Sequence, residues 1–207
     1  GNNETGIVVG KDCFLSSYPI PIDTLKLDSG NCNPECVNKI VSCLLEPSLY
    51  EFREPYMREA VLLLIRGVID TFPSLCNTPD VEKAVLLGLI YLQGKCPGEV
   101  DVVPEVAYNE LVRFANIGNE LSDTDIDEKK KYLDSLFQRH FPFILNSIIS
   151  FSYNAQGLIV SPSPDMIKWD TTSIHRSAFD VLIRLSPSQG WIYHDIVLKI
   201  IGNQVQL

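Results

Sequence analysis

The chain has 207 residues, 45% of them hydrophobic and 21% charged, a composition typical of folded domains with a sizeable buried core. Its 26 acidic and 17 basic residues give a formal net charge of −9, whereas proteins that grip the nucleic-acid backbone need a basic excess, so direct nucleic-acid binding is not expected. The longest wholly apolar run covers residues 60–65, far short of the roughly 20 that span a bilayer, so neither a membrane-spanning helix nor a membrane partner is expected.

Helices dominate the elements predicted along the chain, because prolines mark helix starts and glycines or further prolines mark their ends. Residues 1–31 are predicted to be irregular. The predicted helices cover residues 33–45, 55–71, 79–94, 104–117, 122–139, 142–153, 171–185 and 188–201, with a short helical turn near Met166. No stretch alternates apolar and polar residues as a strand would. The pattern predicts an all-α fold of about eight helices in antiparallel hairpins, forming one domain over residues 32–207 of a larger protein.

The apolar faces of these helices predict how deeply each is buried. Residues 79–93 leave almost no polar face and residues 55–72 are nearly as apolar, so both helices are predicted to be buried on more than one side. Residues 125–141 predict a surface helix with one buried stripe, made of Ile126, Leu133, Leu136, Phe137 and His140.

The last predicted helix carries apolar residues on two faces. Ile192, Ile196 and Ile200 line one face, while Trp191 and Leu198 point elsewhere. Because apolar side chains on a second face need a cover, we expect another molecule or another part of the protein to lie against them.

One helical pattern occurs twice in the sequence. Residues 58–66 (REAVLLLIR) and 176–184 (RSAFDVLIR) share R-x-A-x-x-x-L-I-R, and residues 83–91 give a looser copy with Gly88 inserted. The second copy, read from Asp170, resembles the second helix of a HEAT repeat, with the alanine one position early. The residues that match in kind are Asp170, Ile174, Arg176, Ala178 and Leu182.

This resemblance implies an α-solenoid that acts as a scaffold, with no catalytic residues to carry over. It also implies structural roles for Asp170 and Arg176, which in that family pair between neighbouring repeats. The alternative is an irregular all-α domain, since buried helices bounded by arginine share the same pattern.

Several clusters contain residue types that occur in metal or catalytic sites. Cys32, Cys36 and Cys43 would supply three zinc ligands where four are needed, and helical core packing explains the latter two better. The acidic run 122–128 lacks the glycine and the final glutamate of a calcium loop, so helix capping explains it. The three histidines belong to no nucleophile motif. We therefore expect no metal, no cofactor and no enzymatic activity.

Two further features bear on location and modification. The six cysteines could form three disulfides, but a core of this size needs none, so an intracellular location, cytoplasmic or nuclear, is expected. Ser161 and Ser163 each precede a proline, which would suit proline-directed phosphorylation, although a loop of this composition needs no such role.

The expected function is therefore a non-enzymatic protein–protein interaction domain of a larger complex. The predicted partner-binding residues are Trp191, Tyr193 and Leu198, because aromatic anchors dominate protein interfaces. The alternative interpretation of Trp191 places it in the core.

A rival hypothesis is an all-α regulatory domain for a nucleotide-dependent enzyme, such as a small GTPase, to which it would offer one arginine. Arg113, Arg139 and Arg184 are candidates by residue type alone.

Overall fold

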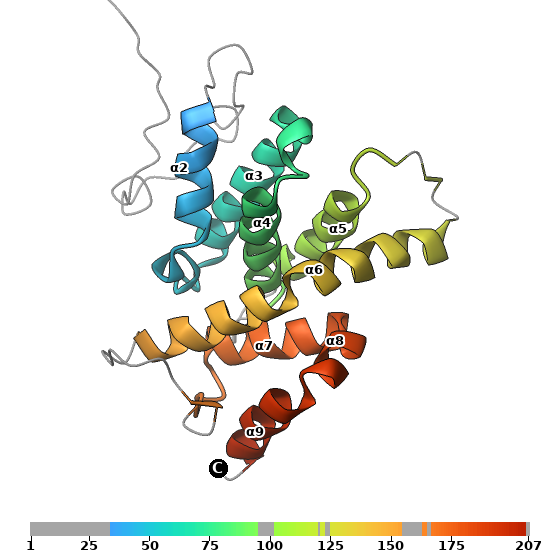
Figure 1. The fold of residues 1–207 in the computed structure, drawn as a ribbon. Helices are drawn as coiled ribbons and strands as arrows, with labels where there is room; N and C mark the ends of the chain where they lie inside the picture. Colours follow the sequence, from blue (N-terminus) through green and yellow to red (C-terminus); the bar gives the residue numbers. More distant parts are fainter. Residues whose placement is uncertain are drawn as a thin grey trace, which may run out of the picture. The chain divides into compact units, whose positions relative to one another are not determined.

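The computed structural model describes residues 34–94, 102–119, 121–122, 125–154, 163–164 and 167–205 (Figure 1). Within these ranges every regular element is helical and no strand occurs, which confirms the predicted all-α fold. The α-helices are α2 (Pro34–Leu44), α3 (Pro55–Thr71), α4 (Pro79–Leu92), α5 (Val103–Ala115), α6 (Ile126–Asn154), α7 (Ile174–Leu185), α8 (Pro187–Ile192) and α9 (His194–Val205). Two 3₁₀ turns, η2 (Pro47–Tyr50) and η3 (Pro73–Leu75), follow α2 and α3. Over the described ranges, no helix combines the length and apolarity needed to cross a bilayer.

The chain divides into two compact units, residues 1–88 and 89–207, with the boundary inside α4. Helix α4 carries the most apolar sequence, and its side chains from residue 84 to 87 and from 89 to 92 are all buried. The prediction that this helix is buried on more than one side is confirmed.

In the first unit, a glycine sets how closely α4 approaches α3. A Cβ atom at Gly88 would lie 2.8 Å from Cδ1 of Ile65 and 3.0 Å from the hydroxyl of Tyr50. Ile65 is fully buried, and the buried Tyr50 hydroxyl donates a hydrogen bond to the carbonyl oxygen of Leu44 at the end of α2. Gly88, an insertion by the repeat pattern, is therefore the residue that lets α3, α4 and η2 pack together.

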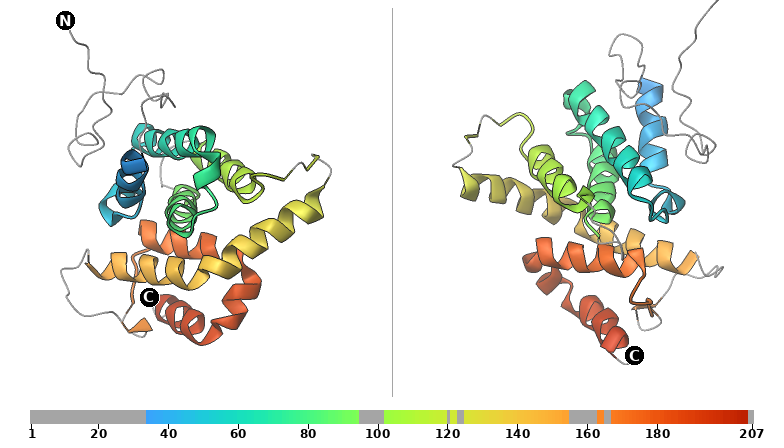
Figure 2. Two further views of the ribbon diagram at one scale, coloured as in Figure 1. Left: turned by 45° about the horizontal axis from the view of Figure 1, so that its top comes forward. Right: turned by 180° about the vertical axis from the view of Figure 1, so that it is seen from behind.

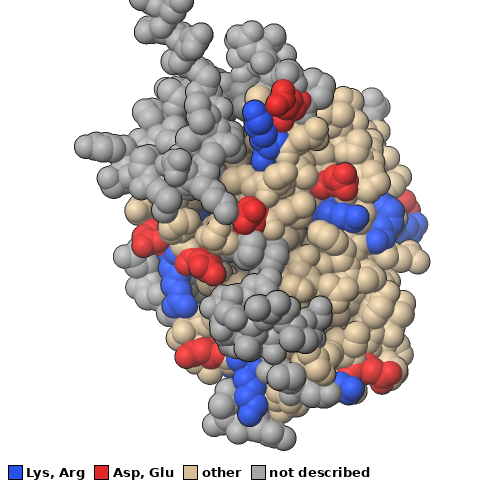
Figure 3. Space-filling view, turned by 60° about the vertical axis from the view of Figure 1, so that its left-hand side comes forward, with Lys and Arg blue, Asp and Glu red and all other residues tan. Residues whose placement is uncertain are grey.

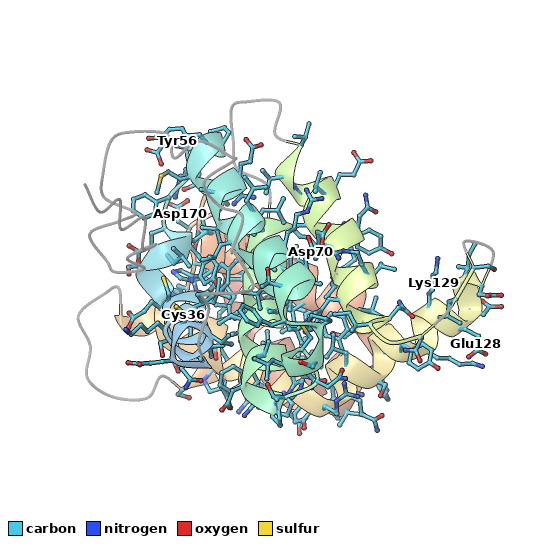
Figure 4. All side chains as sticks on the ribbon, turned by 90° about the horizontal axis from the view of Figure 1, so that it is seen from above. Cys36, Tyr56, Asp70, Glu128, Lys129 and Asp170 are labelled. Carbon is cyan, nitrogen blue, oxygen red and sulfur yellow. The ribbon has the colours of Figure 1, made fainter. Side chains whose placement is uncertain are left out.

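Helix α2 places two of the predicted core cysteines beside the core. Cys36, labelled in Figure 4, and Cys43 are half-buried and flank the fully buried Ile40. Cys32 lies outside the described residues. No group of three or more potential metal ligands occurs among the residues that the structure describes.

The second unit is built around α6, along which α7 runs in the opposite direction, while α9 turns back beneath both (Figures 1 and 2). The predicted break before Pro142 is wrong, because α6 continues through it as one helix of 29 residues. A proline inside a helix removes one backbone hydrogen bond, which the buried stripe of Phe141, Ile144, Leu145 and Ile148 outweighs. Figure 2 shows α6 bending in its middle, as a proline there requires.

Helix α7 begins later than predicted, at Ile174 rather than residue 171. The Ser173 side chain caps it by accepting hydrogen bonds from the N–H groups of His175 (3.2 Å) and Arg176 (3.5 Å). Asp170 lies before the helix, and its carboxylate accepts a hydrogen bond from the Thr172 N–H at 2.8 Å, closing a turn. The local role of Asp170 is thus turn formation, and the HEAT-like solenoid stays a prediction.

Two amide side chains of α9 hold the segment that precedes α7. Gln204 accepts a hydrogen bond from the Trp169 N–H and donates one to the Ile167 carbonyl, both at 3.0 Å. Asn203 donates to the Pro164 carbonyl at 2.9 Å. Trp169 itself is buried and packs against Phe179 of α7, with ring centroids 5.3 Å apart. The C-terminal helix is therefore bonded to a segment far from it in sequence.

The single helix predicted over residues 188–201 is also wrong. The chain forms α8 and α9, which are separated by one turn residue, Tyr193. The Tyr193 ring stacks on Phe141 of α6, with centroids 5.3 Å apart and planes inclined by 21°. We attribute the break to this aromatic contact, which tertiary packing favours over helix continuity.

Candidate functional site

Four exposed apolar side chains lie on α8 and α9, and we call them the α8–α9 surface. Trp191 is 77% exposed, Ile192 63%, Leu198 60% and Ile201 40%. The surface includes two of the three predicted partner-binding residues, Trp191 and Leu198. The core interpretation of Trp191 is wrong. Ile192, which the sequence placed on one face with Ile200, is exposed, whereas Ile200 is fully buried.

Helical spacing within α9 and one ring contact bring these residues together. His194, Leu198 and Ile201 of α9 follow one another at intervals of three or four residues, which places them along one side. Trp191, near the end of α8, joins them through its ring stacking on His194. The neighbouring side of α9 carries the buried Val197 and Ile200. One face of α9 therefore secures it to the unit, and the other presents apolar groups to solvent.

Local contacts hold the Trp191 ring in position. Its ring stacks on the His194 imidazole, with centroids 5.6 Å apart and planes inclined by 27°. The His194 Nδ1 lies 3.0 Å from the Trp191 carbonyl oxygen, and its Nε2 lies 3.1 Å from an Asp195 carboxylate oxygen. An anchor that is already ordered loses less conformational freedom on binding.

Tyr193, the third predicted partner-binding residue, has a different environment. Its stacking on Phe141 directs the ring into the unit, and the side chain is only partly exposed. In the structure Tyr193 therefore supports the position of the α8–α9 surface, whereas its direct contact with a partner stays a prediction.

The three arginines named as candidates for the arginine offered to a nucleotide-dependent enzyme differ in their contacts. Arg139 donates a hydrogen bond to Ser135 on its own helix, at 2.9 Å. Arg113 is held by the nearly buried Glu110 carboxylate, with nitrogen–oxygen distances of 2.9 and 2.6 Å. The exposed Arg184 side chain has no ion pair or hydrogen bond among the described residues. Arg113 and Arg184 line the same surface groove between α5, α6 and α7, and Arg139 does not.

One buried polar pair joins α4 to α7 in the second unit. The Tyr91 hydroxyl lies 2.8 Å from His175 Nδ1, with the two rings edge to face at 5.7 Å. Burial lowers the pKa of His175 from 6.5 to about 4, so the imidazole is neutral near pH 7. The contact between the neutral imidazole and the buried phenol satisfies polar groups of both side chains inside the unit. The expectation of no enzymatic activity stays a prediction.

Charges are interspersed on the face of the molecule that Figure 3 shows. Acidic and basic side chains lie next to one another there, and neither sign forms a patch among the described residues of that face. Of the two serines that precede a proline and would suit phosphorylation, Ser163 is exposed and Ser161 lies outside the described residues.

Comparisons of the chain with protein-family models, with curated proteins and with solved structures gave no match.

Proposed function

We propose that this chain is a protein-binding domain whose α8–α9 surface docks the apolar face of an amphipathic helix from a partner protein. The observation that supports this most is Trp191, a tryptophan more than three-quarters exposed and held in place by its stacking on His194. Tryptophan is the residue type most enriched among side chains that dominate binding free energy.

The shape of the surface favours a helix as the occupant. Leu198 and Ile201 form an exposed ridge on one face of α9, and the exposed Trp191 of α8 extends it by stacking on His194 of that face. A ridge of this kind packs into the groove between side chains of a second helix. Asp195 and Lys199, both exposed, border the ridge with opposite charges and would favour one orientation of the partner.

Selection from a library of displayed amphipathic helices tests the proposal. Helices selected on the unmodified protein are then measured against Trp191→Ala and Leu198→Ala. Each variant should weaken binding about tenfold or more, because truncation of a central anchor removes roughly 2 kcal/mol of binding free energy. Tyr56→Ala is the matched control, since Tyr56 is an aromatic residue of α3 with 58% exposure (Figure 4).

Two outcomes would overturn the proposal. Helices that bind equally well to Trp191→Ala and Leu198→Ala would use another surface. If the protein instead self-associates in sedimentation experiments, and Trp191→Ala abolishes this, the occupant is a second copy of the chain and not a partner helix.

A second candidate function is regulation of a nucleotide-dependent enzyme such as a small GTPase, through one arginine. Arg184 is favoured over Arg113 and Arg139 because its exposed guanidinium has no bonding partner among the described residues. Single-turnover GTP hydrolysis by a panel of GTPases would be accelerated by the protein and not by Arg184→Ala, since a supplied arginine contributes roughly 1,000-fold or more. Unchanged hydrolysis across the panel would eliminate this candidate.

A further inference from the structure

A groove of about 890 Å³ runs between α5, the first half of α6 and the end of α7. A smaller hollow of about 380 Å³ adjoins it and shares Tyr108, Arg184 and Leu185 with it. These elements all belong to the second unit, and none of the lining residues lies on α8 or α9. The groove is therefore separate from the α8–α9 surface.

The charge of the groove is opposite to that of the chain. Its described lining includes four basic side chains, Arg113, Lys129, Lys130 and Arg184, and one acidic side chain, Asp134. Arg113 is neutralised by Glu110, whereas the side chains of Lys130 and Arg184 have no ion pair among the described residues. In a protein of net charge −9, a groove with this balance attracts acidic groups.

Lys129 and the preceding residue, Glu128, point to different sides of α6. Figure 4 shows Lys129 and Glu128 on opposite sides of the first turns of α6. Lys129 lines the groove and Glu128 does not, because consecutive residues of a helix point in different directions. Of the three lysines in the run 129–131, Lys131 pairs with Glu128, whereas Lys129 and Lys130 line the groove together with Asp134.

Apolar and amide groups complete the lining. Val112, Leu133 and Leu185 supply apolar surface, and the exposed side chain of Ile126 forms part of the same wall. The amide of Asn116 donates to the Val112 carbonyl at 2.7 Å, while its Oδ1 is buried without a hydrogen-bond partner among the described residues.

We infer that this basic groove binds a short acidic peptide segment of a protein partner. Carboxylates of the segment pair with Lys129, Lys130 and Arg184, and its apolar side chains cover Val112, Leu133 and Leu185. A peptide supplies both groups that the lining favours, namely carboxylates and apolar side chains. A nucleic acid would match only the cations, and the acidic remainder of the protein repels a long polyanion. The inference does not depend on the proposed function of the α8–α9 surface.

An array of short peptides built from Asp, Glu, Leu, Phe, Gly and Ser provides the probe, beside matched peptides with Lys in place of each acid. A single-stranded oligonucleotide and inorganic phosphate are tested in parallel. Binding is measured for the unmodified protein, for Lys130→Glu combined with Arg184→Glu, and for Lys39→Glu combined with Arg139→Glu. The second pair is the control, because neither of its residues lines the groove.

The expected result is binding of acidic, apolar-containing peptides that weakens about tenfold or more in the groove variant and with rising salt, but not in the control. Trp191→Ala should leave this binding unchanged, which separates the inference from the proposed function. Equal binding of the basic peptides, equal binding by both charge-reversed proteins, or binding of the oligonucleotide without any acidic peptide would each overturn it. Phosphate alone displacing the peptide completely would reassign the groove to a single anion.

Discussion

Replacing Gly88 by alanine should destabilise the protein, although alanine is the better helix former. The added methyl group would lie 2.8 Å from Cδ1 of Ile65, closer than such atoms approach, and 3.0 Å from the Tyr50 hydroxyl, which is a tight contact. Ile65 is fully buried, and the Tyr50 hydroxyl is fixed by its hydrogen bond to Leu44. Neither side chain can therefore move away without disturbing the packing of α3 or η2.

The magnitude follows from two opposing terms. Overpacking a filled core costs about 1–3 kcal/mol, and alanine gains about 1 kcal/mol over glycine in a helix interior. The net expectation is a loss of roughly 1 kcal/mol in the free energy of unfolding, measured by urea denaturation followed by circular dichroism. Gly202 of α9 offers a matched control, since a Cβ there meets no atom within 4 Å. Gly202→Ala should therefore stabilise the protein by up to about 1 kcal/mol.

Opposite signs for the two glycine variants are the essential result. If Gly88→Ala stabilises the protein as much as Gly202→Ala does, the close approach of α3 and α4 would not limit the size of residue 88. The reasoning from packing would then be refuted.

Three further predictions concern single side chains of the second unit. Burial lowers the pKa of His175 to about 4 in the folded state, so below its ordinary pKa of 6.5 the unfolded chain binds a proton that the folded chain does not. The free energy of unfolding should therefore fall by roughly 3 kcal/mol between pH 7 and pH 4 from this group alone. The stability of His175→Phe, measured by melting at each pH, should lack this loss, and an equal pH dependence in both proteins would contradict the prediction. In urea titrations, Trp191→Ala should change the free energy of unfolding by less than about 0.5 kcal/mol, because its side chain is exposed. Tyr193→Ala loses the stacking on Phe141 and should lower the free energy of unfolding by about 2 kcal/mol. A large effect of Trp191→Ala would contradict the exposure of Trp191. Pro142→Ala restores a backbone donor inside α6 and should raise Tm in calorimetry, while a lower Tm would mean that the packing of α6 requires its bend.

Sequence patterns predicted most of the helices, because local chemistry determines where a helix starts and stops. First-turn prolines mark the observed starts of α2, α3 and α4, and the positive φ of Gly118 (81°) lies shortly after the end of α5. Apolarity around the whole of α4 likewise predicted its burial. These features depend on nearby residues alone, so the sequence contains them directly.

The predicted helix boundaries are wrong where tertiary contacts override local preferences. Pro142 signals a helix start, yet the buried stripe that continues past it keeps α6 intact. Residues 188–201 read as one helix, yet Tyr193 interrupts it by stacking on Phe141, a contact between residues distant in sequence. Local periodicity contains no information about either contact.

The sequence indicated the exposed Trp191 but not the groove. Trp191 stood out because it did not share the isoleucine face of the last predicted helix, so an interpretation as a surface anchor was available. The groove was not predicted, because its basic residues come from three helices and only their packing brings Arg184 near Lys130. Acidic residues also flank residues 129–131 in the sequence, so no local excess of positive charge indicated a basic site there.

The two tryptophans of the chain provide separate fluorescent reporters for folding and for occupancy. Trp169 is 2% exposed and should emit at short wavelength, protected from acrylamide, whereas Trp191 is 77% exposed and should emit at long wavelength and be readily quenched. A partner that covers the α8–α9 surface would shift and protect the long-wavelength component alone. Unfolding would instead shift the short-wavelength component. One unlabelled sample can thus distinguish a bound molecule from a denatured one.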